Sequence, residues 1–317
     1  MAAVAAVSLS ACGLQSGGAV PLSVGPAAIQ PVPSLKGVSL TVGSKDFTES
    51  ITLGYIAELA LSAAGANIRD LTNIQGSNSA RVALTSGQID MYFDYTGTGW
   101  INYLGHTKPI PTQQGQYEAV KKEDLKKNSI VWTDLTTVNN TYALALNKKN
   151  AAKLGVNTLS DYAALVQKNP AAAKTCVETE FASRPDGFPG MAKAYGFSST
   201  QAQTQILATG AIYQSTANGS CTFGEVFTTD GRVKGLDLSV LKDDTSFFPI
   251  YDAALNIRES VATKYPAIAT VLEPIVKKLT TETMTQLNAE VDVDGHEQAD
   301  VARDWLVEEG FVTNPNA

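Results

Sequence analysis

The stretch from Val38 to Asp46, VSLTVGSKD, decides the fold of this chain. Apolar residues at every second position in its first half predict a β-strand. The Gly-Ser-Lys-Asp sequence then favours a sharp turn, and the segment 48–64 carries apolar residues at helical spacing until Gly65 ends it. Strand, turn and helix in this order begin a βαβ unit, so we expect an α/β protein with a parallel sheet.

The same alternation continues after this stretch. A second strand is expected near 69–74, a helix near 79–86, and a third strand near 89–93 that leads into the polar turn 95–98. In sheets of this kind, ligands bind beyond the carboxyl ends of the strands, in the loops that follow. The turns 44–46 and 95–98 both follow strands, so the sequence predicts a binding cleft beside them.

The rest of the chain predicts a second α/β unit inserted into the first. Strands near 129–134 and 141–147 would carry the chain across, and the segments 237–242 and 247–257 would bring it back. Further helices are expected near 114–127, 160–167, 189–195, 200–208, 265–279, 281–289 and 298–309. We therefore expect one lobe to consist of 37–141 plus 251–317 and the other of 142–250.

The N-terminus predicts export. Residues 1–11 are small and apolar and end in Leu9-Ser10-Ala11-Cys12, which matches a bacterial lipobox, although no Lys or Arg precedes the apolar run. We interpret 1–11 as the remnant of a signal peptide and Cys12 as a lipidated residue on the outer face of a bacterial cell membrane; the alternative is an ordinary buried cysteine. The Gly-, Ser- and Pro-rich segment 12–36 is then predicted to be a flexible tether.

Two other cysteines, Cys176 and Cys221, fall in the expected second lobe. In an oxidising compartment they are expected to form a disulfide, and two buried free thiols are the alternative. Neither has a neighbouring His or Cys at metal-ligand spacing, so we expect no zinc site.

Composition narrows the class of function. A net charge of -7 argues against a nucleic-acid partner. The two histidines, His106 and His296, lie near no nucleophile motif, and no phosphate-binding glycine loop occurs. We therefore expect a protein that is not an enzyme and that uses no cofactor or metal.

Aromatic residues at expected strand ends and lobe crossings suggest a binding role instead. Tyr95, Tyr142, Phe227 and Tyr251 each occupy such a position. Any one of them alone is explained by packing in a half-buried position. If all of them converge, their rings would form a cage for a soft cation such as trimethylammonium, worth about 2 kcal/mol or more for a desolvated contact.

Six short motifs follow one another along the chain: GSKDFTE at 43–49, DYTGT at 94–98, NNTY at 139–142, SRPDG at 183–187, TDGR at 229–232 and FFPIYD at 247–252. Each is weak alone, but in this order they resemble the glycine betaine/carnitine/choline-binding proteins of osmoprotectant ABC transporters. The similarity runs from about Val38 to Val312. It implies a two-lobed, periplasmic-binding-protein-like fold of type II, a venus flytrap whose lobes close on the ligand.

The resemblance also implies roles for particular residues. The cage tyrosines of the family match Tyr95, Tyr142 and Tyr251, while Phe227 stands where a tyrosine is common. The resemblance further assigns a ligand carboxylate to Lys45 and Arg184, with Thr98 as a donor. It places Asn140 beside the cage, and Ser77 is expected to line the pocket.

Together these features predict a monomeric receptor that binds a quaternary-ammonium osmolyte such as glycine betaine and delivers it to the transmembrane subunits of an ABC permease. A receptor specific for choline or carnitine is one alternative. An exported enzyme acting on small amines, or a sensor domain, would belong to a different class.

Overall fold

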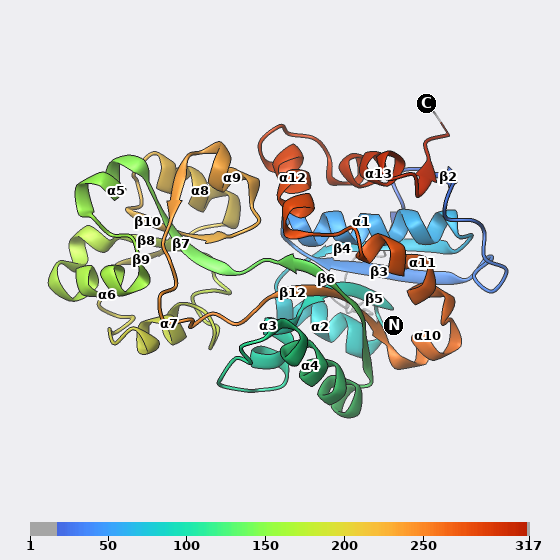
Figure 1. The fold of residues 1–317 in the computed structure, drawn as a ribbon, viewed down its shortest axis with the longest axis horizontal. Helices are drawn as coiled ribbons and strands as arrows, with labels where there is room; N and C mark the ends of the chain where they lie inside the picture. Colours follow the sequence, from blue (N-terminus) through green and yellow to red (C-terminus); the bar gives the residue numbers. More distant parts are fainter. Residues whose placement is uncertain (1–17, 316–317) are drawn as a thin grey trace, which may run out of the picture.

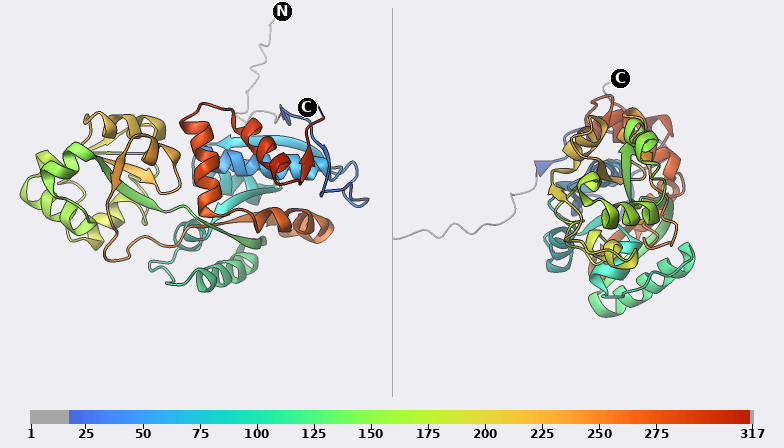
Figure 2. Two further views of the ribbon diagram at one scale, coloured as in Figure 1. Left: turned by 45° about the horizontal axis from the view of Figure 1, so that its top comes forward. Right: turned by 90° about the vertical axis from the view of Figure 1, so that its left-hand side faces the viewer.

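The computed structural model describes residues 18–315, and its longer strands lie in two separate sheets joined by two crossing segments (Figure 1). The two lobes are also separate in the left view of Figure 2, and in the right view one lobe lies in front of the other. The predicted two-lobed α/β class is therefore confirmed. The signal peptide remnant predicted at 1–11 and the lipidated Cys12 lie outside the described residues.

The first sheet has the order β1-β4-β3-β5-β12-β6. Its strands are β1 (Gly18–Ala19), β3 (Ser39–Lys45), β4 (Asn67–Ile74), β5 (Met91–Tyr95), β6 (Ile130–Asn139) and β12 (Asp252–Arg258). The strand β3 pairs in parallel with β4 and β5, as the βαβ pattern predicts. The sheet is mixed and not parallel throughout, because β12 returns from the second lobe and pairs antiparallel with both β5 and β6.

Helices cover both faces of this sheet. On one face lie α1 (Thr48–Ala63), α12 (Thr281–Asp292) and α13 (Gln298–Glu308), and on the other lie α2 (Ser77–Ser86) and α4 (Gln113–Asn128) (Figure 1). The helix α11 (Ala267–Val276) packs on α1 and β6. Leu53, Ile56 and Leu59 of α1 are fully buried, since this helix is enclosed by sheet and helices together.

The second sheet has the order β11-β7-β10-β8-β9. Its strands are β7 (Tyr142–Asn147), β8 (Thr175–Val177), β9 (Thr204–Ile206), β10 (Phe223–Phe227) and β11 (Leu238–Val240). The helices of this lobe are α5 (Lys148–Leu154), α6 (Leu159–Lys168), α7 (Phe188–Ala194), α8 (Thr209–Ala217) and α9 (Gly231–Gly235). The helix expected near 200–208 is not formed. Thr204–Ile206 pairs instead as the edge strand β9 along β8, and the helix begins only at Thr209.

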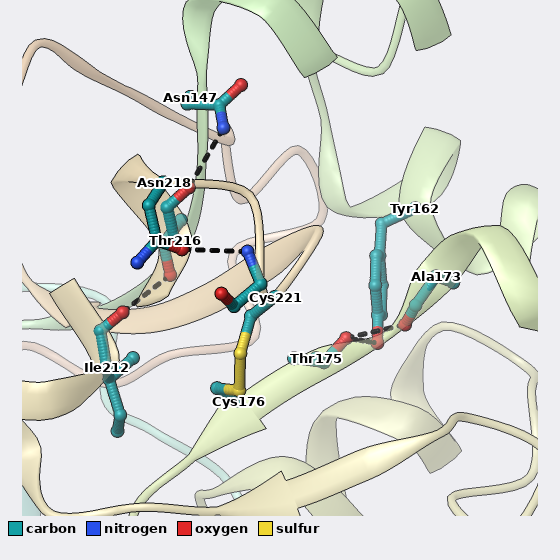
Figure 3. Close-up of a disulfide and its surroundings, with 10 residues drawn as sticks. Asn147, Tyr162, Ala173, Thr175, Cys176, Ile212, Thr216, Asn218 and Cys221 are labelled. Atoms are coloured by element: carbon teal, nitrogen blue, oxygen red, sulfur yellow. Dashed lines mark hydrogen bonds between the residues drawn. A yellow bond between two sulfur atoms is a disulfide. The ribbon is translucent and has the colours of Figure 1, made fainter. Parts of the chain in front are cut away.

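A disulfide joins Cys176 on β8 to Cys221, which precedes β10, with Cα atoms 5.8 Å apart (Figure 3). Both cysteines are buried. The strands β8 and β10 are themselves paired in parallel, so this cross-link joins segments that already lie side by side within the second lobe.

The tether predicted over 12–36 is wrong for residues 18–36. β1 pairs antiparallel with β4, and β2 (Gly25–Pro26) pairs with β13 (Val312–Thr313). Leu35 is fully buried. The segment is rich in Gly, Ser and Pro, but its few apolar side chains pack on the first lobe. Their burial stabilises one conformation of the backbone.

Among residues 18–315, no helix combines the length and the apolar character needed to span a bilayer.

Candidate ligand-binding site

A cavity of about 80 Å³ lies between the lobes, at the carboxyl ends of β3, β5 and β10 and beside both crossing segments. All of the ligand residues predicted from the sequence line it except Arg184: these are Lys45, Ser77, Tyr95, Thr98, Asn140, Tyr142, Phe227 and Tyr251. Arg184 lies just behind, where its guanidinium donates to the hydroxyl oxygens of Thr98 (3.2 Å) and Ser77 (3.4 Å). The topology thus brings the predicted residues together from both lobes.

The aromatic rings form a contiguous cluster. The Tyr142 ring lies edge-on to Tyr251, with centroids 5.5 Å apart and planes at 90°, and it is tilted against Phe227 at 5.2 Å. Phe47 stacks on Phe227 at 5.2 Å and reaches Tyr95 at 5.9 Å. Phe47 was not predicted as a site residue, although it follows the first strand within the motif GSKDFTE. Its ring connects Tyr95 to Phe227, so the cluster contains five aromatic residues.

The hydroxyl of Tyr95 donates to the carboxylate of Glu49, 2.7 Å away. Glu49 also accepts from Asn140 (3.0 Å), Thr229 (2.6 Å) and Asn288 (3.1 Å). Burial raises the pKa of Glu49 above its usual value, against the effect of these hydrogen bonds. The carboxylate therefore connects α1, β5, the crossing segment, the second lobe and α12 at one point behind the aromatic cluster.

Tyr251 is anchored in a similar way. Its hydroxyl donates to Asp186 at 2.7 Å, and Asp186 in turn accepts two hydrogen bonds from Arg184, at 2.8 and 2.7 Å. Burial alone would raise the pKa of Asp186, but Arg184 outweighs it and holds the pKa below the usual range. An ionised carboxylate thus fixes the ring of Tyr251 against the loop of the second lobe.

Both basic residues expected to bind a ligand carboxylate already have acidic partners. Lys45 Nζ lies 3.0 Å from Asp94 Oδ1 and 4.6 Å from the centroid of the Tyr95 ring. Arg184 contacts Asp186 and Glu180, and its guanidinium carbon lies 5.3 Å from the centroid of Tyr142. Arg184 therefore pairs with its neighbour Asp186 and also contacts Thr98 and Ser77 at the site.

Acidic residues that the sequence did not single out also line the cavity. Glu178 and Glu180 come from the loop 178–187 that follows β8. Glu180 crosses to the first lobe, where it accepts hydrogen bonds from the backbone N–H and the hydroxyl of Ser77 at 2.7 and 2.6 Å. No strand is expected at 175–177 from the sequence, so the rule that polar residues after a strand line the cleft does not point to these two residues. Among residues 18–315, no group of three or more His, Cys, Asp or Glu side chains is placed to hold a metal ion.

The protonation state of Glu225, which is buried behind the site, can be tested through the stability of the protein. This residue of β10 accepts from the backbone N–H of Glu178 at 2.7 Å, and burial raises its pKa to about 8. Between about pH 4.5 and pH 8 the folded chain therefore holds a proton that the unfolded chain has lost. The free energy of unfolding should fall as pH rises through this window, by up to about 1.4 kcal/mol per pH unit for one proton.

Glu225→Gln should remove this pH dependence. As the pH rises from 5 to 8, the free energy of unfolding of the variant should therefore increase relative to that of the wild type. Urea unfolding at both pH values measures the difference, with Glu118→Gln at an exposed position as the control. Parallel pH profiles for wild type and Glu225→Gln would contradict the assignment.

The fold and the cavity together define a class: a two-lobed substrate-binding protein with its site at the lobe interface. Residues 38–308 match the family described as the substrate binding domain of the ABC-type glycine betaine transport system. The chain belongs to this family. Members of the family are binding components of transporters, so the prediction that the protein is not an enzyme is confirmed.

The chain is also similar to individual substrate-binding proteins. The chain is 36% identical to the glycine-betaine-binding protein of Pseudomonas aeruginosa, over 88% of this chain and 90% of the relative. It is 37% identical to the ergothioneine transport permease/ergothioneine binding protein EgtU of Helicobacter pylori, over 84% of this chain but only 47% of that longer protein. The solved structure of apo YehZ from Escherichia coli superposes with a TM-score of 0.63 at 32% identity, covering 86% of this chain and 99% of that one.

Proposed function

We propose that this chain is the extracytoplasmic receptor of an ABC importer and that it binds a quaternary-ammonium osmolyte, glycine betaine or a close analogue, between its lobes. The observation that carries the proposal is the convergence of five aromatic residues from both lobes and both crossings on one cavity. A trimethylammonium group is large, weakly hydrated and positively charged, which is the combination that aromatic faces attract.

The lobes, 37–141 plus 251–317 and 142–250, would close as rigid bodies about the crossing segments at 140–141 and 241–251. Cross-lobe contacts support this motion: Arg184 of the second lobe reaches Thr98 of the first, and Asn102 of the first lobe donates to Asp186 at 3.0 Å. A ligand that contacts both lobes favours the closed form by its additional contacts there. The closed form would then be recognised by the permease.

A matched pair of ligands measures what the positive charge of the ligand contributes, through the aromatic faces and the nearby carboxylates together. Glycine betaine and 3,3-dimethylbutanoate have nearly the same shape, but the second carries a neutral tert-butyl group in place of trimethylammonium. A contribution of about 2 kcal/mol corresponds to roughly thirtyfold in affinity, so calorimetry should show betaine binding at least tenfold more tightly. Equal affinities would contradict the cage. Choline, carnitine and ergothioneine belong in the same titration series, the last because of the H. pylori relative.

We also propose that Cys12 attaches the receptor to the membrane. The support is the lipobox sequence Leu9-Ser10-Ala11-Cys12. Mass spectrometry of the mature protein from its native membrane tests this, since an unmodified Cys12 would contradict it.

A further inference from the structure

We propose that Glu180 determines ligand specificity: its carboxylate occupies the hydrogen-bond donors that a ligand carboxylate would otherwise use, and so it disfavours zwitterionic ligands relative to plain cations. This inference rests on the proposed function, because it concerns ligands of the same cavity. The donors in this cavity that are suited to an anion already bind one, the Glu180 carboxylate.

The contacts of Glu180 are those of a bound carboxylate. Its two oxygens accept from the backbone N–H of Ser77 and from the Ser77 hydroxyl, at 2.7 and 2.6 Å, and one of them also contacts Arg184 Nη1. Ser77 is the first residue of α2, a helix of 10 residues, so its N–H points out of the helix with a favourable dipole behind it. A helix terminus, a hydroxyl and a guanidinium form a suitable receptor for an anion, and a side chain of the protein fills it.

The charge of the site leads to the same conclusion. Lys45 and Arg184 bring two positive charges, whereas three carboxylates contact them: Asp94, Asp186 and Glu180. Burial would raise the pKa of Glu180, but Arg184, Lys45 and the bonds from Ser77 outweigh it and keep the pKa below its usual value. The site therefore holds an excess of negative charge beside the cage. A cation is favoured there, and a carboxylate on the ligand meets repulsion unless Glu180 moves away.

Displacing Glu180 also breaks a contact between lobes. Glu180 belongs to the second lobe and Ser77 to the first, so their hydrogen bonds help to hold the lobes together. A zwitterion that takes these donors must provide an equivalent bridge of its own. A cation without a carboxylate can leave Glu180 in place and use the bridge as it stands.

The experiment compares two ligands that share trimethylammonium and differ in the carboxylate: glycine betaine and choline. Affinities are measured by calorimetry for wild type, Glu180→Gln and Glu180→Ala. The ratio of betaine affinity to choline affinity should rise about tenfold or more in both variants, since removal of the negative charge frees Ser77 and Arg184 for the ligand. The control is Glu118→Gln, which removes one negative charge at an exposed position outside the cavity lining and should leave the ratio unchanged.

A Glu180 that only bridges the lobes would behave differently. Both affinities would then fall together and the ratio would stay within about twofold of the wild type, which overturns the inference. Glu180→Gln keeps the shape of the side chain, so it carries the test if Glu180→Ala does not fold. Should the wild type bind no trimethylammonium compound at all, the proposed function itself fails, and that result is distinct from binding with an unchanged ratio.

Discussion

Tyr142→Ala is expected to weaken glycine betaine binding by about tenfold or more. The Tyr142 ring is central in the cage, with centroids 5.2 Å from Phe227, 5.5 Å from Tyr251 and 4.8 Å from Phe181. Alanine removes one π face, worth about 1–2 kcal/mol toward a desolvated cation, and it also removes the ring against which Tyr251 and Phe227 are set.

Calorimetry measures this loss, and Tyr142→Phe is the matched control. Phenylalanine keeps the ring and its position, so its affinity should stay within about threefold of the wild type. Thermal unfolding of the ligand-free variants separates loss of binding from loss of structure. A Tyr142→Ala protein that is folded and binds betaine as tightly as the wild type would show that this ring is packing and not part of the ligand site.

Gly231→Ala is expected to keep the lobes from closing and so to weaken binding by about tenfold or more. Gly231 begins α9 of the second lobe, and α9 packs on α12 of the first lobe (Figure 1). A Cβ atom at this position would lie 2.4 Å from the Cα atom of Ala289 and 2.8 Å from its backbone nitrogen. Because the obstacle is backbone, it cannot be relieved by a side-chain rotation. The lobes must separate instead, and the population of the closed form falls.

The same interface offers a control at Gly235. A Cβ atom there would meet only the Val293 side chain, at 3.0 Å, and this side chain can shift. Gly235→Ala should therefore bind nearly as the wild type does. Small-angle scattering in saturating ligand should show a larger radius of gyration for Gly231→Ala than for Gly235→Ala. Identical radii and affinities for the two variants would mean that closure does not bring Gly231 onto Ala289.

Local patterns predicted the elements that depend on their own residues. The alternation over β3, the helical spacing of α1 and the stop at Gly65 are all properties of short segments, and the structure has them nearly where the sequence places them. The antiparallel β12 was not predictable in this way. The residues of β12 are buried on both faces of the sheet, and the chain reaches this position from the other lobe. The sequence of such a strand alone does not specify which strands it pairs with.

The site shows a similar division. The position of a residue after a strand is readable from sequence, so Tyr95 and Lys45 could be placed near the cleft. The sequence does not show which charged and polar groups pair. Lys45 pairs with Asp94, which lies on a different strand, and Glu180 contacts Ser77, which lies in the other lobe. Glu49 lies within a quoted motif, but a glutamate in the first turn of a helix is ordinarily exposed. Only the packed structure makes it a buried acceptor of four hydrogen bonds.

The position of β12 bears on the order in which the molecule can assemble. Among residues 18–315, β12 is the one strand that pairs with β6, and β12 also pairs with β5. The first sheet therefore lacks an inner strand until residue 258 is available. The strands of the second sheet, by contrast, all lie within 142–240, a continuous segment that closes on itself and carries the Cys176–Cys221 cross-link. If the chain folds as it is made from the N-terminus, the inserted lobe is therefore complete before the first lobe is. Until β12 is available, the edges of β5 and β6 stay unpaired. That delay is the period in which the protein is most exposed to mispairing with other chains.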